Sequence, residues 1–325
     1  MADLVTLDEI KAARERIKTA AVYTPMLRVT WPGQAPSPTS QALYLKCENL
    51  QPMGAFKIRG AFNMIAQLPK DSLQRGVITY SSGNHGQAVA LAAQAIGAPA
   101  VIVMPTTAPK VKVDGCKSYG AEVIMEGTTS LDRQRRAEQE AAARGLTIVP
   151  PFDHKLIIIG QGTMGLEILE QCPDVATVVV PVGGGGMASG VAAAIKLSKP
   201  SVRIVAVEPE GAPKMTTSLK AGQPTTLPSS ASIADGLMNL RPGDITFAHI
   251  QKFVDEVVTV SEAAIAGNVG WLFRHARLVV EPSGAVTTAA VALGLGHIDP
   301  SKGPVVAVVS GGNVAPEAFA KYVTA

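Results

Sequence analysis

The stretch Thr177-Val-Val-Val-Pro-Val-Gly-Gly-Gly-Gly-Met187 joins a short β-branched run to four consecutive glycines and an Ala/Val/Ile-rich segment. The run is apolar at successive positions, as in a strand that is buried on both faces of a parallel sheet. The segment from Met187 onward has the composition of a helix. Glycines at a strand-to-helix turn leave backbone N–H groups open to an anion, so the pattern predicts either a phosphate cradle or simply a tight turn.

Five further runs of this kind alternate with Ala-rich segments along the chain. They cover residues 77–80, 101–104, 122–125, 203–207 and 305–309. Strand-helix alternation over the whole length predicts an α/β fold with one open sheet or two. Three runs precede Pro150-Pro151 and three follow it, so the two prolines are a candidate crossing point between two sets of strands.

The N-terminus carries the pattern of an opening helix. Thr6 and Glu9 have the spacing of a capping box, and Ile10, Ala13 and Ile17 follow at helical spacing. By contrast, the Pro/Gly/Ser-rich segment that starts at Trp31 and ends at residue 40 predicts a surface loop.

Composition restricts the class of protein. The 325 residues are 47 % hydrophobic and 17 % charged, which is typical of globular chains and not of disordered ones. A net charge of +3 is too small to indicate binding to nucleic acid or to a membrane surface. Three isolated cysteines (Cys47, Cys116, Cys172) favour a reducing compartment, and neither a secretory pattern nor a membrane-spanning run is present. We therefore expect a cytoplasmic protein.

Two more polar glycine loops follow predicted strands. Ser81-Ser82-Gly83-Asn84-His85-Gly86-Gln87 comes after the strand that ends at Tyr80, and Ser310-Gly-Gly-Asn313 comes after the strand that ends at Val309. Ligands of open α/β sheets bind at the carboxyl ends of strands, so three such loops predict one shared crevice. Helix capping would explain a single loop but not all three.

Lys57 is a candidate for covalent chemistry. It is flanked by Gly54, Phe56 and Gly60. An arbitrary lysine in such a place would lie along a helix surface with its ammonium in water. A desolvated and partly neutral lysine can instead form a Schiff base, and Phe56 offers an apolar wall beside it.

Seven motifs occur in order between about residues 5 and 318. They lie at residues 46–61, 81–87, 160–163 (Gly-Gln-Gly-Thr), 183–186, 234–236 (Ala-Asp-Gly), 281–285 (Glu-Pro-Ser-Gly-Ala) and 310–313. The set resembles the pyridoxal-phosphate enzymes of fold type II, and among them the threonine/serine dehydratases (ammonia-lyases) and serine racemases. The resemblance implies two open twisted α/β domains of the tryptophan synthase β-subunit-like type, with the cofactor in the crevice between them. Residues 1–48 and 150–325 would form the large cofactor-binding domain, and residues 49–149 the small one.

The resemblance also implies roles for single residues. Lys57 matches the Schiff-base lysine that takes the Cα proton, and Ser82 matches a candidate proton donor on the opposite face. Residues matching cofactor contacts are Phe56, Asn84, Gly183, Gly184, Gly185, Gly186, Met187, Glu281 and Ser310; those matching substrate contacts are Ser81, Ser82, Asn84 and His85. Ser310 would face the pyridine nitrogen. A neutral hydroxyl there cannot hold a proton on that nitrogen as a carboxylate would, which favours elimination over transamination.

The implied reaction is β-elimination from L-threonine or L-serine to a 2-oxo acid and ammonia, in a homodimer without a C-terminal effector domain. Serine racemase is the alternative within the family, followed by dehydration of 3-hydroxyaspartate or phenylserine. A non-catalytic phosphate- or nucleotide-binding protein would explain the glycine loops but not Lys57. Met53 and Ala55 stand where the family commonly has hydroxyl residues, and this leaves the preferred substrate open.

The stretch Glu208-Pro-Glu-Gly-Ala-Pro-Lys214 departs from the racemase pattern. Racemases of this type hold a divalent cation there with a Glu, a backbone carbonyl and an Asp. Lys214 occupies the Asp position, and a cation beside it would meet a like charge. We therefore expect no metal at this place, or one that is held differently.

Ser82 separates dehydration from racemisation. Elimination needs a base on one face of the Cα, whereas racemisation also needs a proton donor on the other face. The alternative role of Ser82 is to cap the helix that starts near Gly83, worth about 1 kcal/mol. We expect Ser82→Ala to abolish D-serine formation while 2-oxo acid release from L-threonine stays within about tenfold, as measured by chiral chromatography and a 2-oxo acid assay. Wild-type protein that makes no D-serine, or a variant that loses both activities together, would contradict the donor role.

Overall fold

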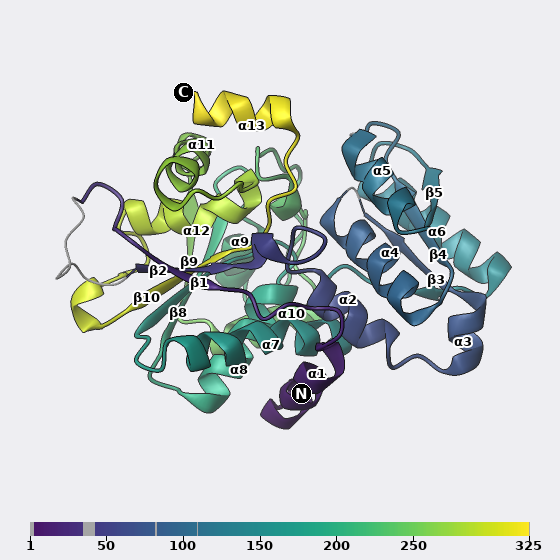
Figure 1. Ribbon diagram of the computed structural model, residues 1–325, viewed down its shortest axis with the longest axis horizontal. Helices are drawn as coiled ribbons and strands as arrows, with labels where there is room; N and C mark the ends of the chain where they lie inside the picture. Colours follow the sequence, from purple (N-terminus) through teal and green to yellow (C-terminus); the bar gives the residue numbers. More distant parts are fainter. Residues whose placement is uncertain (1–2, 35–42, 82, 109, 325) are drawn as a thin grey trace.

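The computed structural model describes residues 3–34, 43–81, 83–108 and 110–324, and it contains two β-sheets (Figure 1). The large sheet has the order β1-β2-β10-β7-β8-β9. Its strands are β1 (Met26–Val29), β2 (Leu43–Cys47), β10 (Val305–Val309), β7 (Thr177–Pro181), β8 (Arg203–Pro209) and β9 (Glu256–Val260). The β1–β2 pair at one edge is antiparallel, and the other described neighbours are parallel.

Helices cover both faces of the large sheet. Val178 and Val180 of β7 point into one core, which contains α1 (Leu7–Ile17), α7 (Lys155–Gln171), α8 (Gly186–Ser198) and α10 (Asp244–Phe253). Val179 points into the opposite core, which contains α11 (Glu262–Trp271) and α12 (Pro282–Ala292). Because alternate residues of a strand face opposite sides and both sides are buried, the run is apolar throughout. Two shorter helices, α9 (Lys214–Ala221) and α13 (Pro316–Val323), complete this part of the chain.

The small sheet has the order β5-β4-β3-β6 and is parallel. Its strands are β5 (Glu122–Met125), β4 (Ala100–Met104), β3 (Val77–Tyr80) and β6 (Thr147–Ile148). One face packs against α2 (Ile58–Ile65), α4 (Asn84–Ile96) and α5 (Lys110–Ser118), and the other against α6 (Ser130–Arg144). A short helix, α3 (Lys70–Arg75), precedes β3. Helix α2 also packs against α7 and so lies between the two sheets (Figure 1).

The predicted α/β class with two open sheets is confirmed. All six predicted runs are strands: β3, β4 and β5 lie in the small sheet, and β7, β8 and β10 in the large one. The Thr6–Glu9 capping box is also confirmed. Strands β1, β2, β6 and β9 were not predicted. The domain limits near residues 48 and 150 stay a prediction, although the strands change sheet after β2 and after β6.

The prediction that a surface loop starts at Trp31 is wrong for this residue. Its side chain is only 7 % exposed and packs in the core formed by α11 and α12. The rest of that predicted loop lies largely outside the described residues. Burial of the large indole ring outweighs the polar composition of the residues that follow it.

A buried charge network lies where the two sheets meet. The Arg59 guanidinium, 1 % exposed, donates to both oxygens of Glu48 at 2.8 Å and to Glu167 at 2.6 and 2.9 Å. Lys46 donates to the same Glu167 at 2.6 Å. Two cations and two carboxylates therefore satisfy one another away from water. Arg59 lies in the first turn of α2, two residues after Lys57, so the network fixes the start of this helix.

Removal of the guanidinium should destabilise the protein strongly. Arg59→Met leaves Glu48 and Glu167 buried without their bidentate partner, which costs about 3–5 kcal/mol of unfolding free energy. Arg14 is the matched control, because it pairs with Glu170 on the same helix α7 but in an exposed position. Arg14→Met should cost less than about 1 kcal/mol. Urea denaturation of both variants measures the difference, and equal losses would contradict the role of the network.

Candidate active site

Two of the three polar glycine loops, those after β3 and β10, meet at the carboxyl ends of their strands. Asn84 begins α4 after β3, and its side-chain oxygen accepts a 2.9 Å hydrogen bond from Asn313 Nδ2, which follows β10. The segment before Lys57 pairs with the same end of β10: Phe56 N donates to Ser310 O at 3.1 Å and Gly312 N donates to Gly54 O at 2.9 Å. The predicted convergence of these segments is therefore confirmed.

The loop after β6 connects Lys57 to the four glycines. Lys57 Nζ donates a 2.7 Å hydrogen bond to Pro151 O. The next residue, Phe152, lies so close to Gly184 that a Cβ on Gly184 would collide with the phenyl ring. Two consecutive residues, Pro151 and Phe152, thus contact the Lys57 amine and the glycine loop respectively.

Burial shifts the Lys57 amine toward its neutral form. Burial lowers its pKa from the ordinary 10.5 to about 8. Its nitrogen lies 5.2 Å from the centroid of the Phe56 ring, which supplies the predicted apolar wall. A pKa near 8 leaves an appreciable neutral fraction close to neutral pH, which imine formation and proton abstraction both require.

The glycine loop has the form of an anion cradle. Helix α8 begins at Gly186, and its N-cap Gly185 has φ +105° and offers no side-chain cap. The first N–H groups of an α-helix have no intrahelical partner and carry the positive end of the helix dipole. Phe152 on one side and Thr246, which donates to Gly184 O at 2.7 Å, hold the loop in place. The cradle therefore fits a phosphate group.

Glu281 and Ser310 line the crevice from the large sheet. Glu281 is 2 % exposed; its Oε1 accepts a 2.6 Å hydrogen bond from Asn84 Nδ2, and its Oε2 has no hydrogen-bond partner among the described residues. Burial, together with the charge of Asp235, raises the Glu281 pKa to about 8. Ser310 is 4 % exposed and donates from Oγ to Ser283 O at 3.3 Å. An orphaned buried oxygen and a hydroxyl thus lie near the Lys57 segment, where a polar ring could be held.

Two side chains of the segment predicted to receive the substrate carboxylate form hydrogen bonds within the protein. His85 is buried and donates from Nε2 to Val149 O at 3.0 Å, and burial beside Lys57 lowers its pKa to about 3. The neutral His85 side chain therefore links α4 to the segment at Val149 and brings no positive charge. Ser81 Oγ accepts from Gly83 N at 3.2 Å. Ser82 lies outside the described residues.

Some residues around the crevice were not predicted from the sequence. The sequence marks Pro151 only as part of a candidate crossing point between the two sets of strands, and no local pattern marks Phe152 or Thr246. Lys112 of α5 forms an ion pair with Asp235 across the crevice and lies over Gly83. Asp235 belongs to the Ala-Asp-Gly motif, so the motif could have indicated it, whereas nothing in the sequence marks Lys112.

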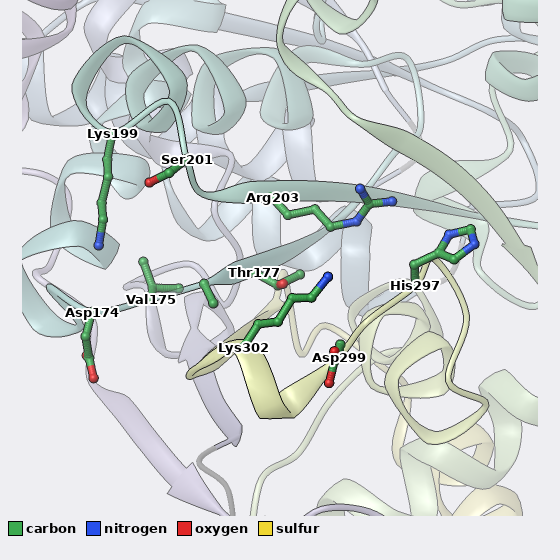
Figure 2. Close-up of a pocket in the computed structure, with 10 residues that line it drawn as sticks. Asp174, Val175, Thr177, Lys199, Ser201, Arg203, His297, Asp299 and Lys302 are labelled. Atoms are coloured by element: carbon green, nitrogen blue, oxygen red, sulfur yellow. The ribbon is translucent and has the colours of Figure 1, made fainter.

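A surface pocket of about 430 Å³ lies away from this site (Figure 2). Thr177 and Arg203, which line it, are the first residues of β7 and β8. The pocket therefore opens at the amino-terminal ends of the strands, opposite the glycine loops. Neither the Lys57 amine nor the cradle reaches it.

A lysine amine of lowered pKa and a helix N-terminus that can accept an anion lie on connected segments of the fold, which suits a pyridoxal-phosphate enzyme. The chain belongs to the family of pyridoxal-phosphate dependent enzymes, whose model matches residues 17–311. The predicted cofactor, enzyme class and fold type are thereby confirmed.

Relatives of this chain include threonine ammonia-lyases and serine racemases. The chain is 43 % identical to L-threonine ammonia-lyase of Thermotoga maritima over 96 % of this chain and 76 % of the relative. It is 42 % identical to serine racemase of Arabidopsis thaliana over 94 % of this chain and 92 % of the relative. The structure of maize serine racemase superposes with a TM-score of 0.89 at 38 % identity, covering 98 % and 97 % of the two chains. Among the described residues, no helix is long and apolar enough to cross a membrane.

The raised pKa of Glu281 predicts a pH-dependent stability of the apo-protein. Between pH 4.5, the ordinary pKa of a glutamate, and about pH 8, Glu281 keeps its proton in the folded protein but loses it in the unfolded chain. The stabilisation is therefore complete below about pH 4.5 and is lost as pH rises toward about 8. Glu281→Gln has no proton to lose, so its advantage over wild type should grow through this window to a few kcal/mol. Melting curves of both apo-proteins from pH 4 to about 9 test this, and a stability difference that does not change with pH would show that folding leaves the Glu281 pKa at its ordinary value.

Proposed function

We propose that this protein catalyses β-elimination from L-threonine or L-serine, giving a 2-oxo acid and ammonia. The observation that carries the proposal is the combination of a low-pKa Lys57 amine with a hydroxyl, not a carboxylate, at Ser310. The relative named L-threonine ammonia-lyase supports the same reaction.

The side chains divide the work as follows. Pyridoxal phosphate, when bound, supplies a ring that withdraws electrons from the substrate Cα. The glycines 183–186 and Met187 bind its phosphate with the N–H groups of α8, while Phe56, Asn84, Glu281 and Ser310 orient the ring. The neutral Lys57 amine takes the Cα proton. The β-hydroxyl then leaves with a proton as water, and hydrolysis of the resulting imine consumes one water and releases ammonia.

Substrate recognition is assigned to the start of α4. Ser81, Ser82 and Asn84 receive the substrate carboxylate, with backbone N–H groups at the helix N-terminus as donors. His85, which the sequence also suggested for this role, supports the segment through its hydrogen bond to Val149 O. This arrangement suits any small β-hydroxy amino acid. Serine racemisation is the second candidate, because a relative of nearly equal identity has that name. Dehydration of 3-hydroxyaspartate or phenylserine ranks behind it.

Cellular setting and assembly belong to the same proposal. Cys47, Cys116 and Cys172 are free and buried, which suits a reducing cytoplasm. We infer a homodimer from the family resemblance alone. The division into a large domain (1–48 and 150–325) and a small domain (49–149) is supported by the strand membership of the two sheets.

A substrate panel with a lysine variant tests the function. We expect 2-oxo acid release to be fastest with L-threonine or L-serine, and Lys57→Ala to slow it by about a thousandfold or more because the general base is lost. Lys110→Ala, at an exposed lysine of α5, should leave the rate unchanged. Borohydride reduction followed by peptide mapping should label Lys57. A label on another lysine, or no 2-oxo acid from any β-hydroxy amino acid, would refute the proposal.

A further inference from the structure

Lys214 is a fully buried cation that the proposed reaction does not use. Its side chain is 0 % exposed, and its ammonium donates to three backbone carbonyls: Leu237 O at 2.8 Å, Ala212 O at 3.0 Å and Val182 O at 3.2 Å. An ammonium has three N–H donors, so these carbonyls use all of them. Glu208 Oε2 lies somewhat farther away, at 3.4 Å.

Glu208 supplies the countercharge from a fixed position. The carboxylate is fully buried and accepts from Met215 N at 3.0 Å and Thr216 N at 2.8 Å, in the first turn of α9. Helix N–H groups favour the ionised carboxylate. Burial lowers the pKa of Lys214, and the Glu208 charge opposes this effect. Three carbonyl oxygens and one carboxylate are the donor set that a small hard cation takes in proteins.

The carbonyls of Val182, Ala212 and Leu237 form a carbonyl cage around the Lys214 ammonium, and this cage is joined directly to the glycine loop. Val182, whose carbonyl accepts from Lys214, is the residue before Gly183. Leu237 ends the 3₁₀ turn Asp235–Leu237, and Gly183 packs against that turn. The Lys214 ammonium thus connects Val182, just before the glycine loop, to Leu237 in the Asp235–Leu237 turn. Lys214 also contacts Glu208 and Ala212, the two other groups expected from the resemblance to hold a divalent cation.

We propose that the Lys214 ammonium acts as a tethered monovalent cation that positions the phosphate-binding glycine loop, and that the cage accepts a free alkylammonium ion once the side chain is shortened. The link to phosphate rests on the function proposed above. A buried lysine paired only with Glu208 would stabilise the fold without this link. The three carbonyl contacts, two of them on the segments that flank Gly183, favour the positioning role.

Truncation and chemical rescue test the proposal. Lys214→Ala removes three carbons and the ammonium group of the side chain. Propylammonium chloride supplies the same three carbons and ammonium as a separate molecule. Lys214→Met fills the same space without charge, and 1-propanol is the uncharged control additive. The readout is the dissociation constant of pyridoxal phosphate from the apo-protein, followed by absorbance in a buffer free of potassium and ammonium, together with the melting temperature of the apo-protein.

We expect Lys214→Ala to weaken cofactor binding by at least about tenfold. Propylammonium, but not propanol, should restore the affinity. Lys214→Met should bind the cofactor weakly with or without either additive. Wild-type affinity in Lys214→Ala, or a loss that propylammonium leaves unchanged, would overturn the proposal. Should Lys214→Ala fail to fold, its refolding yield becomes the readout, and equal yields in propylammonium and propanol would overturn it.

Two further measurements isolate the cause. Wild-type cofactor affinity and melting temperature should not respond to EDTA, and a loss that Mg²⁺ or Ca²⁺ restores would overturn the proposal because a metal would then do the positioning. Gly184→Ala places a methyl group against the Phe152 ring and should weaken cofactor binding directly. If Gly184→Ala weakens binding and the Lys214 variants do not, the role of Lys214 alone fails. If Gly184→Ala has no effect either, the loop is not the phosphate site and both proposals fall.

Discussion

The position of Lys57 depends on the ion pairs that the buried guanidinium of Arg59 makes. The Arg59 charge is buried away from water and needs carboxylate partners. The two that it contacts lie on different elements: Glu48 follows β2, and Glu167 belongs to α7. Unpaired burial of any one of these groups would be costly. The start of α2 is therefore fixed against both elements. Lys57, two residues earlier, has little freedom to leave the crevice.

A second constraint comes from the way separate loops hold one another. The segment before Lys57 is hydrogen-bonded to the loop after β10, and that loop reaches Asn84 through Asn313. On the other side, Pro151 accepts from Lys57 while Phe152 packs against the glycine loop. Each loop is thus supported by another loop at the carboxyl end of a strand. Such mutual support can hold reacting groups more precisely than a single flexible loop would.

The sequence predicted what depends on local pattern and missed what depends on distant partners. Strands such as β7 and β10 were recognisable because burial on both faces makes them apolar throughout. Strand β2 carries the buried Lys46, whose countercharge on Glu167 lies far along the chain, so its pattern is not that of a core strand. Likewise the three glycine loops were recognisable from composition, whereas Pro151 and Phe152 acquire their roles only through tertiary contact. The like charge of Lys214 argued against a metal, but the carbonyls around it could not be inferred from spacing.

Burial favours the neutral forms of three titratable side chains around the site, and this limits how the site can bind an anion. Burial is the largest cause of the pKa changes of Lys57 and His85, which fall, and of Glu281, which rises. All three groups are thereby shifted toward their uncharged forms. The buried Lys214 ammonium, which contacts Val182 O just before the glycine loop, is balanced by Glu208 and so contributes geometry more than net attraction. In the function proposed here, a phosphate at the glycine loop is held chiefly by oriented N–H dipoles at the start of α8, which keep their direction only as long as the loop does. Loop position, and with it the carbonyl cage around Lys214, therefore matters more for cofactor affinity than the sum of nearby charges.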